Sequence, residues 1–502
     1  MNKEKNSQKD EKDEIVDMNE AIKLLNTTRP TFYRWLRSGK IKGMKVGRQW
    51  RFYRSEIERF LKGEEPRIEL NADIKPFIKI LQEKARSLGN QETPDENADE
   101  VTQAVDLIIA LAVKMESSDI HLANYIKDDS KYSAILRYRI DGVLYTIADM
   151  DIRLLPPIIE KWKTLAICDV NEHKKPQEGS IHANVAGKEI EMRVCFLPTS
   201  LGESIAVRIL NTGANQFMGL SLDDLGFLEE DRNKILRCLK SPWGMIIVSG
   251  PTGSGKSTVL YVCLKITNRL DVNVITVEDP VEYIMPWTSQ IPVQRNSGIT
   301  FANVLRTVMI SDPDVIMIGE IQDGETLSMA HNCALTGHLV LTIMHANGAI
   351  GTLKYMMDMG SNPNIIAEST KLIISQRLVR KLCPECSTEI SSPNAIELAE
   401  KIAINGGLDW DKIPKNFREP IGCANCRGTG YKGRTVVAEI LEITPQIVKA
   451  MTMGTSFIVL SPDNIKKQAV EQGMITMSAD GIRKAGMGIT SLSEVMRVTS
   501  GA

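Results

Sequence analysis

Short apolar runs bounded by turn residues recur in the second half of the chain, and their length is that of β-strands. They are Met245–Val248, Val274–Val277 and Val315–Ile318. A helical pattern follows the first run, over about 259–267. We therefore expect an α/β domain over residues 213–502.

A different pattern precedes this domain. Ala134–Ile140 and Glu189–Cys195 alternate between apolar and polar residues, as half-buried strands do. Helical patterns are mixed with them, so we predict an α+β domain over residues 101–212. Residues 64–100 are expected to be a linker that carries one helix, over about 72–88.

The front of the chain has a third pattern. Residues 1–14 are almost wholly polar, and we expect a disordered tail there. Within residues 15–63, short helices are predicted over 19–25 and 31–37, and a β-hairpin is predicted around the turn Gly47-Arg48. The order helix, turn, helix and hairpin predicts a small separate domain.

Composition excludes several classes of protein. Of the 502 residues, 43% are hydrophobic and 25% are charged, which is ordinary for a globular protein. No segment approaches the roughly 18 apolar residues of a membrane-spanning helix, and the N-terminus lacks the apolar run of a secretion signal. We therefore expect a cytoplasmic protein without membrane insertion, held at the inner face of a membrane only through partners.

A glycine-rich loop between a predicted strand and a predicted helix carries the clearest chemistry. Its residues are Gly250, Pro251, Thr252, Gly253, Ser254, Gly255, Lys256, Ser257 and Thr258. Such a loop wraps backbone N–H groups around phosphates at the positive end of a helix. Lys256 would reach the β- and γ-phosphates, and the Ser257 hydroxyl would bind Mg²⁺. The sequence therefore predicts a site for ATP with Mg²⁺.

Two carboxylates follow later strands. Glu278 ends the run Val274–Val277, and Glu320 comes just after Val315–Ile318. Ligands of an α/β sheet bind outside the carboxyl ends of its strands, so both are candidates for orienting water or the metal ion. The alternative is that they only cap loops.

Four of the nine cysteines form two Cys-x-x-Cys pairs. The pairs are Cys383 with Cys386 and Cys423 with Cys426. Four thiolates close a tetrahedron around Zn²⁺ and leave no open position, so we expect a structural zinc site within residues 381–432. C-terminal helices are expected over 433–502. A redox dithiol and an iron site are the alternatives.

Beyond the phosphate loop, the chain resembles the secretion and pilus-assembly ATPases, namely the E-type ATPases of type II secretion and the PilB-type ATPases of type IV pili. The similarity covers about Val101 to Thr499. The matching segments are Ser118–Leu122, Arg137–Gly142, Leu197–Thr199, Gly202–Ser204, Ile275–Glu282, Asp312–Glu320, Ala334–Val340 with His345, and Gly428–Arg434. The resemblance implies a P-loop RecA-like ATPase core preceded by a PAS-like α+β domain.

The same resemblance implies roles for single residues. Glu320 would ready the attacking water, Glu278 would help place Mg²⁺ and water, and His345 would sense the γ-phosphate. The family works as a hexameric ring in which arginines of the smaller domain reach the neighbour's ATP, and Arg193 and Arg208 occupy the matching places. Surface arginines without a catalytic role are the alternative. The chain departs from the family pattern at Gln322, at Ile310 or Ser311, and at Ala346.

The front domain is similar to the winged helix of excisionase and MerR-like DNA binders. Ten basic and only two acidic residues lie between Arg29 and Arg59. Thr31–Arg37 matches the recognition helix and Val46–Arg51 matches the wing. The candidate DNA contacts are Thr31, Tyr33, Arg34, Arg37, Arg48 and Arg51. Docking of a protein partner through residues 15–63 is the alternative.

These observations predict an ATP-hydrolysing hexameric motor. By resemblance, it would drive assembly of a type II secretion pseudopilus or a type IV pilus at an inner-membrane platform, with pilins or pseudopilins as its cargo. The alternative is a DNA-binding ATPase that acts as a regulator or as a motor on nucleic acid. The departures from the family pattern at Gln322 and Ile310 would weaken ATP hydrolysis. A ring that serves mainly as a scaffold is therefore a third interpretation.

Overall fold

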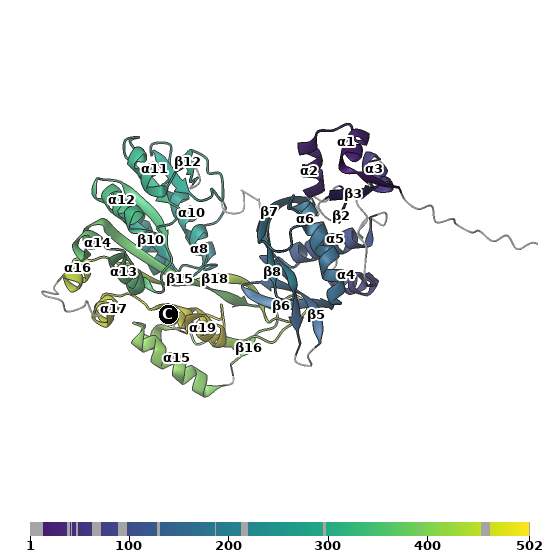
Figure 1. The fold of residues 1–502 in the computed structure, drawn as a ribbon. Helices are drawn as coiled ribbons and strands as arrows, with labels where there is room; N and C mark the ends of the chain where they lie inside the picture. The colour runs from purple at the N-terminus through teal and green to yellow at the C-terminus, as the bar shows by residue number, and fades with distance from the viewer. Residues whose placement is uncertain are drawn as a thin grey trace, which may run out of the picture. The chain divides into compact units, whose positions relative to one another are not determined.

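The computed structural model describes residues 14–37, 41, 43–46, 49–62, 72–88, 98–127, 131–185, 187–211, 219–294, 298–390, 392–452 and 462–500. The chain divides into two compact units, Met1–Gly213 and Ala214–Ala502 (Figure 1). The predicted disordered tail lies outside the described residues except for its last residue, Glu14. No helix of the described part is long and apolar enough to cross a membrane.

The front of the first unit has three helices and three short strands. They are β1 (Ile15–Asp17), α1 (Met18–Leu24), α2 (Arg29–Arg37), β2 (Met44–Val46), β3 (Gln49–Tyr53) and α3 (Arg54–Leu61). The strands form an antiparallel sheet in the order β1-β3-β2. Phe32 of α2 and Phe52 of β3 meet edge to face at 5.1 Å in the buried centre of this domain. The helices α1 and α2 thus pack on the β2–β3 hairpin through a shared aromatic core.

The rest of the first unit is an antiparallel sheet covered by helices on one face. Its elements are α4 (Lys75–Ser87), α5 (Glu100–Lys114), β4 (Asp119–Ile126), β5 (Tyr132–Ile140), β6 (Val143–Met150), η1 (Ile152–Leu154), α6 (Leu155–Leu165), β7 (Gln177–Val185), β8 (Lys188–Thr199) and β9 (Gly202–Asn211). The strand order is β6-β5-β4-β9-β8-β7. Tyr138, Trp162 and Phe196 are buried in the core between sheet and helices.

Helix α4 lies within the stretch that was predicted as a linker with one helix. Phe77 and Leu81 of α4 are buried in the same core as Val105 and Ile108 of α5. This helix is therefore part of the packed unit, and the apolar residues that recur along it are its buried face.

The second unit is built on a seven-stranded sheet in the order β12-β11-β13-β14-β10-β15-β18. Its strands are β10 (Gly244–Ser249), β11 (Val274–Glu278), β12 (Thr288–Pro292), β13 (Val315–Ile318), β14 (Leu339–Met344), β15 (Thr370–Leu382) and β18 (Tyr431–Glu442). All neighbouring pairs are parallel except β15 with β18. The expected α/β architecture of this part of the chain is confirmed.

Helices cover both faces of this sheet (Figure 1). Ile246 and Val248 of β10 belong to one core and Met245 and Ile247 to the other, as successive residues of a strand must. The first face packs α8 (Leu222–Leu225), α9 (Glu229–Leu239) and α10 (Lys256–Thr267). The second face packs α11 (Phe301–Val308), α12 (Gly324–Leu335), α13 (Ala349–Asp358), α14 (Pro363–Ser369), α16 (Pro445–Thr452) and α17 (Pro462–Glu471).

The segment between β15 and β18 is an insertion at the end of the sheet. It contains β16 (Thr388–Glu389), α15 (Pro393–Asn405), η3 (Trp410–Lys412) and β17 (Arg418–Glu419), and it packs with α18 (Met477–Gly486) and α19 (Leu492–Thr499) around a small core of its own. Both Cys-x-x-Cys pairs lie in this insertion. The two long strands therefore hold the cysteine segment at its two ends.

Candidate functional site

The glycine-rich loop connects β10 to α10 through unusual backbone conformations. Gly250, Gly253 and Gly255 have φ values of 143°, 77° and 83°, in the region that residues with a side chain rarely adopt. A Cβ on Gly250 would come within 2.4 Å of the carbonyl oxygen of Gln376. Glycine is therefore required at position 250 both for its conformation and for the close approach of β15.

Lys256 is the first residue of α10, and its side chain is buried over the loop. The Nζ atom donates hydrogen bonds to the carbonyl oxygens of Gly250 and Pro251, both at 2.9 Å. Burial lowers the pKa of Lys256, and the nearby charge of Glu320 opposes that shift. The ammonium group therefore sits inside the loop at the N-terminus of the helix, where phosphate oxygens are bound in sites of this type.

Three parallel strands bring the other groups to the same edge. Glu320 follows β13, and His345 follows β14. The Nε2 atom of His345 lies 3.3 Å from Oε2 of Glu320, and the amide of Gln322 donates a hydrogen bond to the other oxygen, Oε1. The structure thus brings together Glu320, His345 and Gln322, at the edge of the sheet where the parallel strand β10 leads into the loop.

Glu278 has a different environment. Its side chain is 3% exposed, and its carboxylate accepts hydrogen bonds from the hydroxyl of Tyr261, from Oγ1 of Thr276 at 2.7 Å and from Nε2 of Gln290 at 2.9 Å. Burial and the hydrogen bond to Glu278 raise the pKa of Tyr261 well above its usual value. Both carboxylate oxygens are therefore engaged by neutral donors of the protein itself.

Gln290 extends this network into the loop that follows β11. Its Nε2 also donates to the carbonyl oxygen of Tyr283 at 2.8 Å, and its Oε1 accepts from the backbone N–H of Met285 at 2.7 Å. One side chain on β12 thus ties the loop to Glu278, and Tyr261 ties Glu278 to the phosphate-loop helix. Sequence reasoning missed Tyr261 and Gln290, because neither belongs to a recognisable motif.

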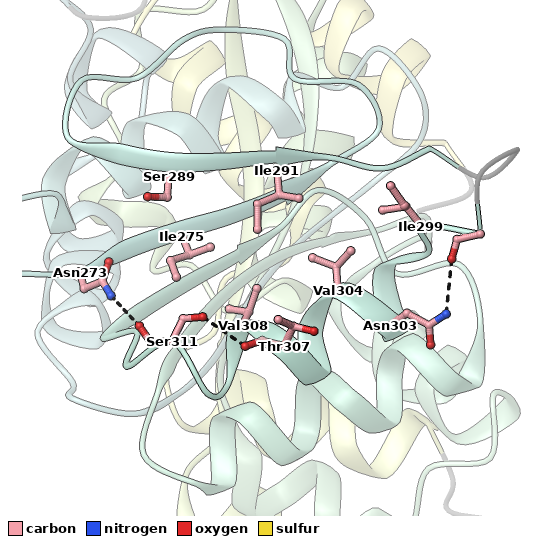
Figure 2. A pocket seen from close by; sticks show the side chains of 11 residues that line it. Asn273, Ile275, Ser289, Ile291, Ile299, Asn303, Val304, Thr307, Val308 and Ser311 are labelled. Atoms are coloured by element: carbon pink, nitrogen blue, oxygen red, sulfur yellow. Dashed lines mark hydrogen bonds between the residues drawn. The ribbon is translucent and has the colours of Figure 1, made fainter.

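A cavity of about 610 Å³ lies between β11, β12 and α11, away from the phosphate loop in the sequence (Figure 2). Ile275, Ile291 and Val304 line it, and none of the described lining residues is charged. The amide of Asn273 is hydrogen-bonded to the backbone oxygens of Ser311 at 3.1 Å and of Asp312 at 2.8 Å.

Arg193 and Arg208 belong to the first unit and face each other across β8 and β9. Both line a cavity of about 570 Å³ on the sheet. Nε of Arg208 donates to Oδ1 of Asp119 at 3.1 Å. The two arginines that the sequence nominated are therefore adjacent to each other.

The candidate DNA contacts lie at the front of the chain. Arg34 is exposed on α2, whereas Thr31 and Tyr33 are half-buried. Arg51 on β3 is half-buried and donates to the Oε1 atom of Gln49 at 3.0 Å. Arg48 and the side chain of Arg37 lie outside the described residues.

The four cysteines of the two pairs converge. Their sulfur atoms all lie within 4.8 Å of one another, with Sγ–Sγ distances of 3.8 Å for Cys383 and Cys423 and 3.7 Å for Cys386 and Cys426. Thiolates around one Zn²⁺ ion have this arrangement, because the Zn–S bond is about 2.3 Å long and the geometry is tetrahedral. The cluster therefore fits a zinc ion closed off on all sides.

Backbone N–H groups point at the sulfur atoms. Those of Cys423 and Gly430 lie 3.1 and 3.2 Å from Sγ of Cys426. Burial would raise the pKa of Cys426, but these donors and the neighbouring thiols lower it to about 6. Burial and the neighbouring thiols raise the pKa of Cys386 to about 12. A cluster with one acidic thiol and one held protonated releases protons when a divalent cation binds.

Comparison with known proteins identifies two families along the chain. Residues 95–497 match the family described as type II/IV secretion system protein. Residues 15–65 match a helix-turn-helix domain. Together the two matches cover the front domain and both larger parts of the chain.

Individual relatives of the chain support the match to the secretion system family. The chain is 36% identical over 406 residues to the type IV pilus assembly ATPase PilB of Myxococcus xanthus, a match that covers 80% of this chain and 69% of that protein. It is 36% identical over 399 residues to the type II secretion system protein E of Aeromonas hydrophila, covering 80% and 75% of the two chains. The PilB protein of Pseudomonas aeruginosa is 39% identical over 414 residues, covering 82% and 69%.

A solved structure agrees with the fold. The ATPase DotB of Legionella pneumophila superposes with a TM-score of 0.56 at 20% identity, and the match covers 82% of this chain and 99% of that one. At this identity the likeness speaks for the fold alone. The arrangement of an α+β part before a parallel α/β sheet is thus one that a known ATPase also has.

The cysteine cluster gives a first prediction. We expect the purified protein to hold about one zinc ion per chain, and Cys423→Ser to lose it, because three thiolates bind the ion more weakly than four. Metal content by plasma mass spectrometry measures this directly. Cys238→Ser is the matched control, since it removes a half-buried thiol outside the cluster. Unchanged zinc in Cys423→Ser, or iron in its place, would contradict the assignment.

The environment of Glu278 gives a second prediction. Glu278→Gln and Tyr261→Phe should lower ATP turnover by similar factors, on the order of 10-fold, because the first removes the charge of the acceptor and the second removes the donor of the same hydrogen bond. The Mg²⁺ concentration for half-maximal rate should stay unchanged in both. Tyr355→Phe, which removes a hydroxyl outside this network, serves as control. A clear rise in the Mg²⁺ requirement of Glu278→Gln alone would instead make Glu278 a ligand of the metal ion.

Proposed function

The chain belongs to the type II/IV secretion system protein family, and we propose that it is a hexameric ATPase motor with a RecA-like nucleotide domain. Its task is the assembly of a pilus or pseudopilus at an inner-membrane platform, on the cytoplasmic side. The observation that carries this proposal is the meeting of Lys256, Glu320 and His345 at one edge of a parallel sheet. The named relatives of the family, PilB and secretion protein E, supply the cellular task.

The phosphate loop would bind the nucleotide. Residues 250–258 present backbone N–H groups at the N-terminus of α10, where the helix carries partial positive charge. The ammonium of Lys256 would exchange its two carbonyl partners for phosphate oxygens. The hydroxyl of Ser257 would hold Mg²⁺, which neutralises charge on the phosphates when bound.

Glu320 would act on water. A carboxylate can orient and deprotonate an attacking water when it lies near the γ-phosphate and is itself held in place. His345 and Gln322 contact different oxygens of Glu320, so they would fix its plane. His345 would couple the carboxylate to the phosphate, and Glu278 would keep the loop after β11 in position.

Arg193 and Arg208 would act on the nucleotide of a neighbouring subunit. Charge develops on the transferred phosphoryl group in the transition state, and an arginine supplied by another subunit stabilises it. The two arginines lie in the first unit, on a sheet face that is open to solvent, as such a role requires. Ring formation would then be a condition for hydrolysis.

The motor proposal is tested by ATP turnover as a function of protein concentration, with the mass followed by light scattering. We expect the rate per subunit to rise as hexamers form. Glu320→Gln should lower it on the order of 100-fold or more, because a general base is lost while nucleotide binding remains. Glu325→Gln, an exposed carboxylate on α12, is the matched control. Equal rates for wild type and Glu320→Gln would contradict the proposal.

A second candidate function is DNA binding by the front domain. The match to a helix-turn-helix domain and the exposed Arg34 on α2 favour it. α2 would enter the major groove and the β2–β3 hairpin would act as a wing against phosphate. A regulator or a motor on nucleic acid would follow from such binding, and docking of a protein is the alternative for the same surface.

Salt titration separates these two cases. If the front domain reads DNA, the affinity for duplex DNA in fluorescence anisotropy should fall steeply with salt, and Arg34→Ala with Arg51→Ala should weaken it by about 10-fold or more. Arg153→Ala with Arg269→Ala removes the same charge from exposed positions elsewhere. Equal losses in both double variants would point to non-specific attraction and would leave the protein-docking role for this domain.

A further inference from the structure

A row of charged residues crosses the solvent face of the six-stranded sheet. Strand pairing sets Arg139 opposite Asp119, Asp119 opposite Arg208, and Arg208 opposite Arg193. Residues directly opposite each other on neighbouring strands share one face of a sheet. Three guanidinium groups and a single carboxylate thus stand in line across β5, β4, β9 and β8.

Asp119 is the most firmly held residue of this row. Only 8% of the residue is exposed. Its Oδ1 accepts a hydrogen bond from Nε of Arg208 at 3.1 Å, and its Oδ2 accepts one from the hydroxyl of Ser118 at 2.7 Å and lies 3.6 Å from Nε of Arg139. Both carboxylate oxygens are engaged, so the plane of the carboxylate is set by its surroundings.

Arg208 is held at its inner end only. The atom that Asp119 binds is Nε, whereas 61% of the Arg208 side chain is exposed. A guanidinium group is planar, so a bond at Nε fixes the direction in which its outer nitrogen atoms point. Asp119 thereby orients the exposed end of Arg208 without covering it.

The row has an excess of positive charge. Arg193 stands directly opposite Arg208, and like charges in that position repel. Asp119 is shared with Arg139, so it compensates only part of this repulsion. Both arginines line a cavity of about 570 Å³, which the carboxylates of Asp119 and Glu178 also line. An arrangement that is unfavourable by itself becomes favourable when an anion binds between the two groups.

We propose that Asp119 is a positioning residue, which aims Arg208 at the phosphate oxygens of a nucleotide bound by a neighbouring copy of the chain. This inference rests on the proposed motor function and adds to it a residue that touches no nucleotide. Asp119 acts through Arg208, and the excess charge of the row is matched by the triphosphate. A purely structural Asp119 would instead serve only the fold of the sheet.

The first test compares steady-state kinetics of Asp119→Asn with wild type. The asparagine is close to the same size but binds Nε more weakly, because it lacks the charge. We expect kcat to fall about 10- to 100-fold, the range seen when a residue that orients a metal ligand is removed. The KM for ATP should change less than about twofold. Asp149→Asn is the control, since it removes an exposed carboxylate paired with Lys127 on the same sheet.

Arg208→Lys probes the same contact from the other side. Lysine keeps the charge but has no Nε to be held, so it should lower kcat like Asp119→Asn. The double variant should be no slower than the slower single variant, because both break one interaction. Additive losses would overturn the proposal. This variant also keeps the test decisive if Asp119→Asn fails to fold.

Mixed assemblies separate this proposal from the motor proposal. Arg208→Ala subunits keep their own Glu320, and Glu320→Gln subunits keep their own Arg208, so mixing the two should restore activity if the arginine acts between subunits. If mixing gives no such gain, Arg208 does not act between subunits, and the proposed role of Asp119 is wrong as well. If the gain appears, two further mixtures test the role of Asp119.

Asp119→Asn is then mixed with each of the two variants. With Glu320→Gln the activity should rise, because the partner supplies a correctly aimed Arg208. With Arg208→Ala it should not rise above the sum of the separate rates, because both subunits lack that arrangement. A rise in the second mixture would mean that Asp119→Asn damages its own nucleotide site or fold, and it would overturn the proposal while leaving the motor function intact.

Discussion

Backbone hydrogen bonds hold β10, β14 and β13 side by side and parallel, and three loops leave the sheet where these strands end. The first leads to Lys256 at the start of α10, the second carries His345 and the third carries Glu320. Ser249 and Met344, the last residues of β10 and β14, are paired, and Ile318, the last residue of β13, pairs with Thr342. Because the positions of the three side chains follow from where these strands end, the apolar residues that bury this sheet also determine the geometry of the candidate site.

The two carboxylates of the candidate site lie in different environments. Glu320 is partly exposed and contacts a histidine and an amide, so it can still meet a water molecule. Glu278 is buried and its oxygens are taken by Tyr261, Thr276 and Gln290. A general base needs access to water and a positioning group needs to be held in place, so each environment suits the role proposed for its residue. Position at a strand end, which both share, does not distinguish them.

Local patterns in the sequence predicted the parts of the fold that depend on near neighbours. The phosphate loop, the paired cysteines and the strands Val274–Val277 and Val315–Ile318 were identifiable because their signals are contiguous. The contacts of Tyr261 with Glu278 and of Asp119 with Arg208 were not, because they join residues 17 and 89 positions apart. Strand pairing brings Asp119 and Arg208 together, and the packing of α10 against the sheet brings Tyr261 to Glu278. The short strand β1 was missed because three residues carry too little alternation.

Strand β15 connects two sites that differ in chemistry. At Gln376 its backbone carbonyl forms the floor under Gly250, and the Gln376 amide donates to the carbonyl oxygen of Ser254 at 2.8 Å. The same strand ends at Leu382, next to Cys383 of the cysteine cluster. About 20 Å of extended backbone, at roughly 3.3 Å per residue, thus joins the loop to the cluster. A β-strand within a sheet is already extended and resists stretching. Tension on the cysteine segment would therefore pass along β15 to the phosphate loop.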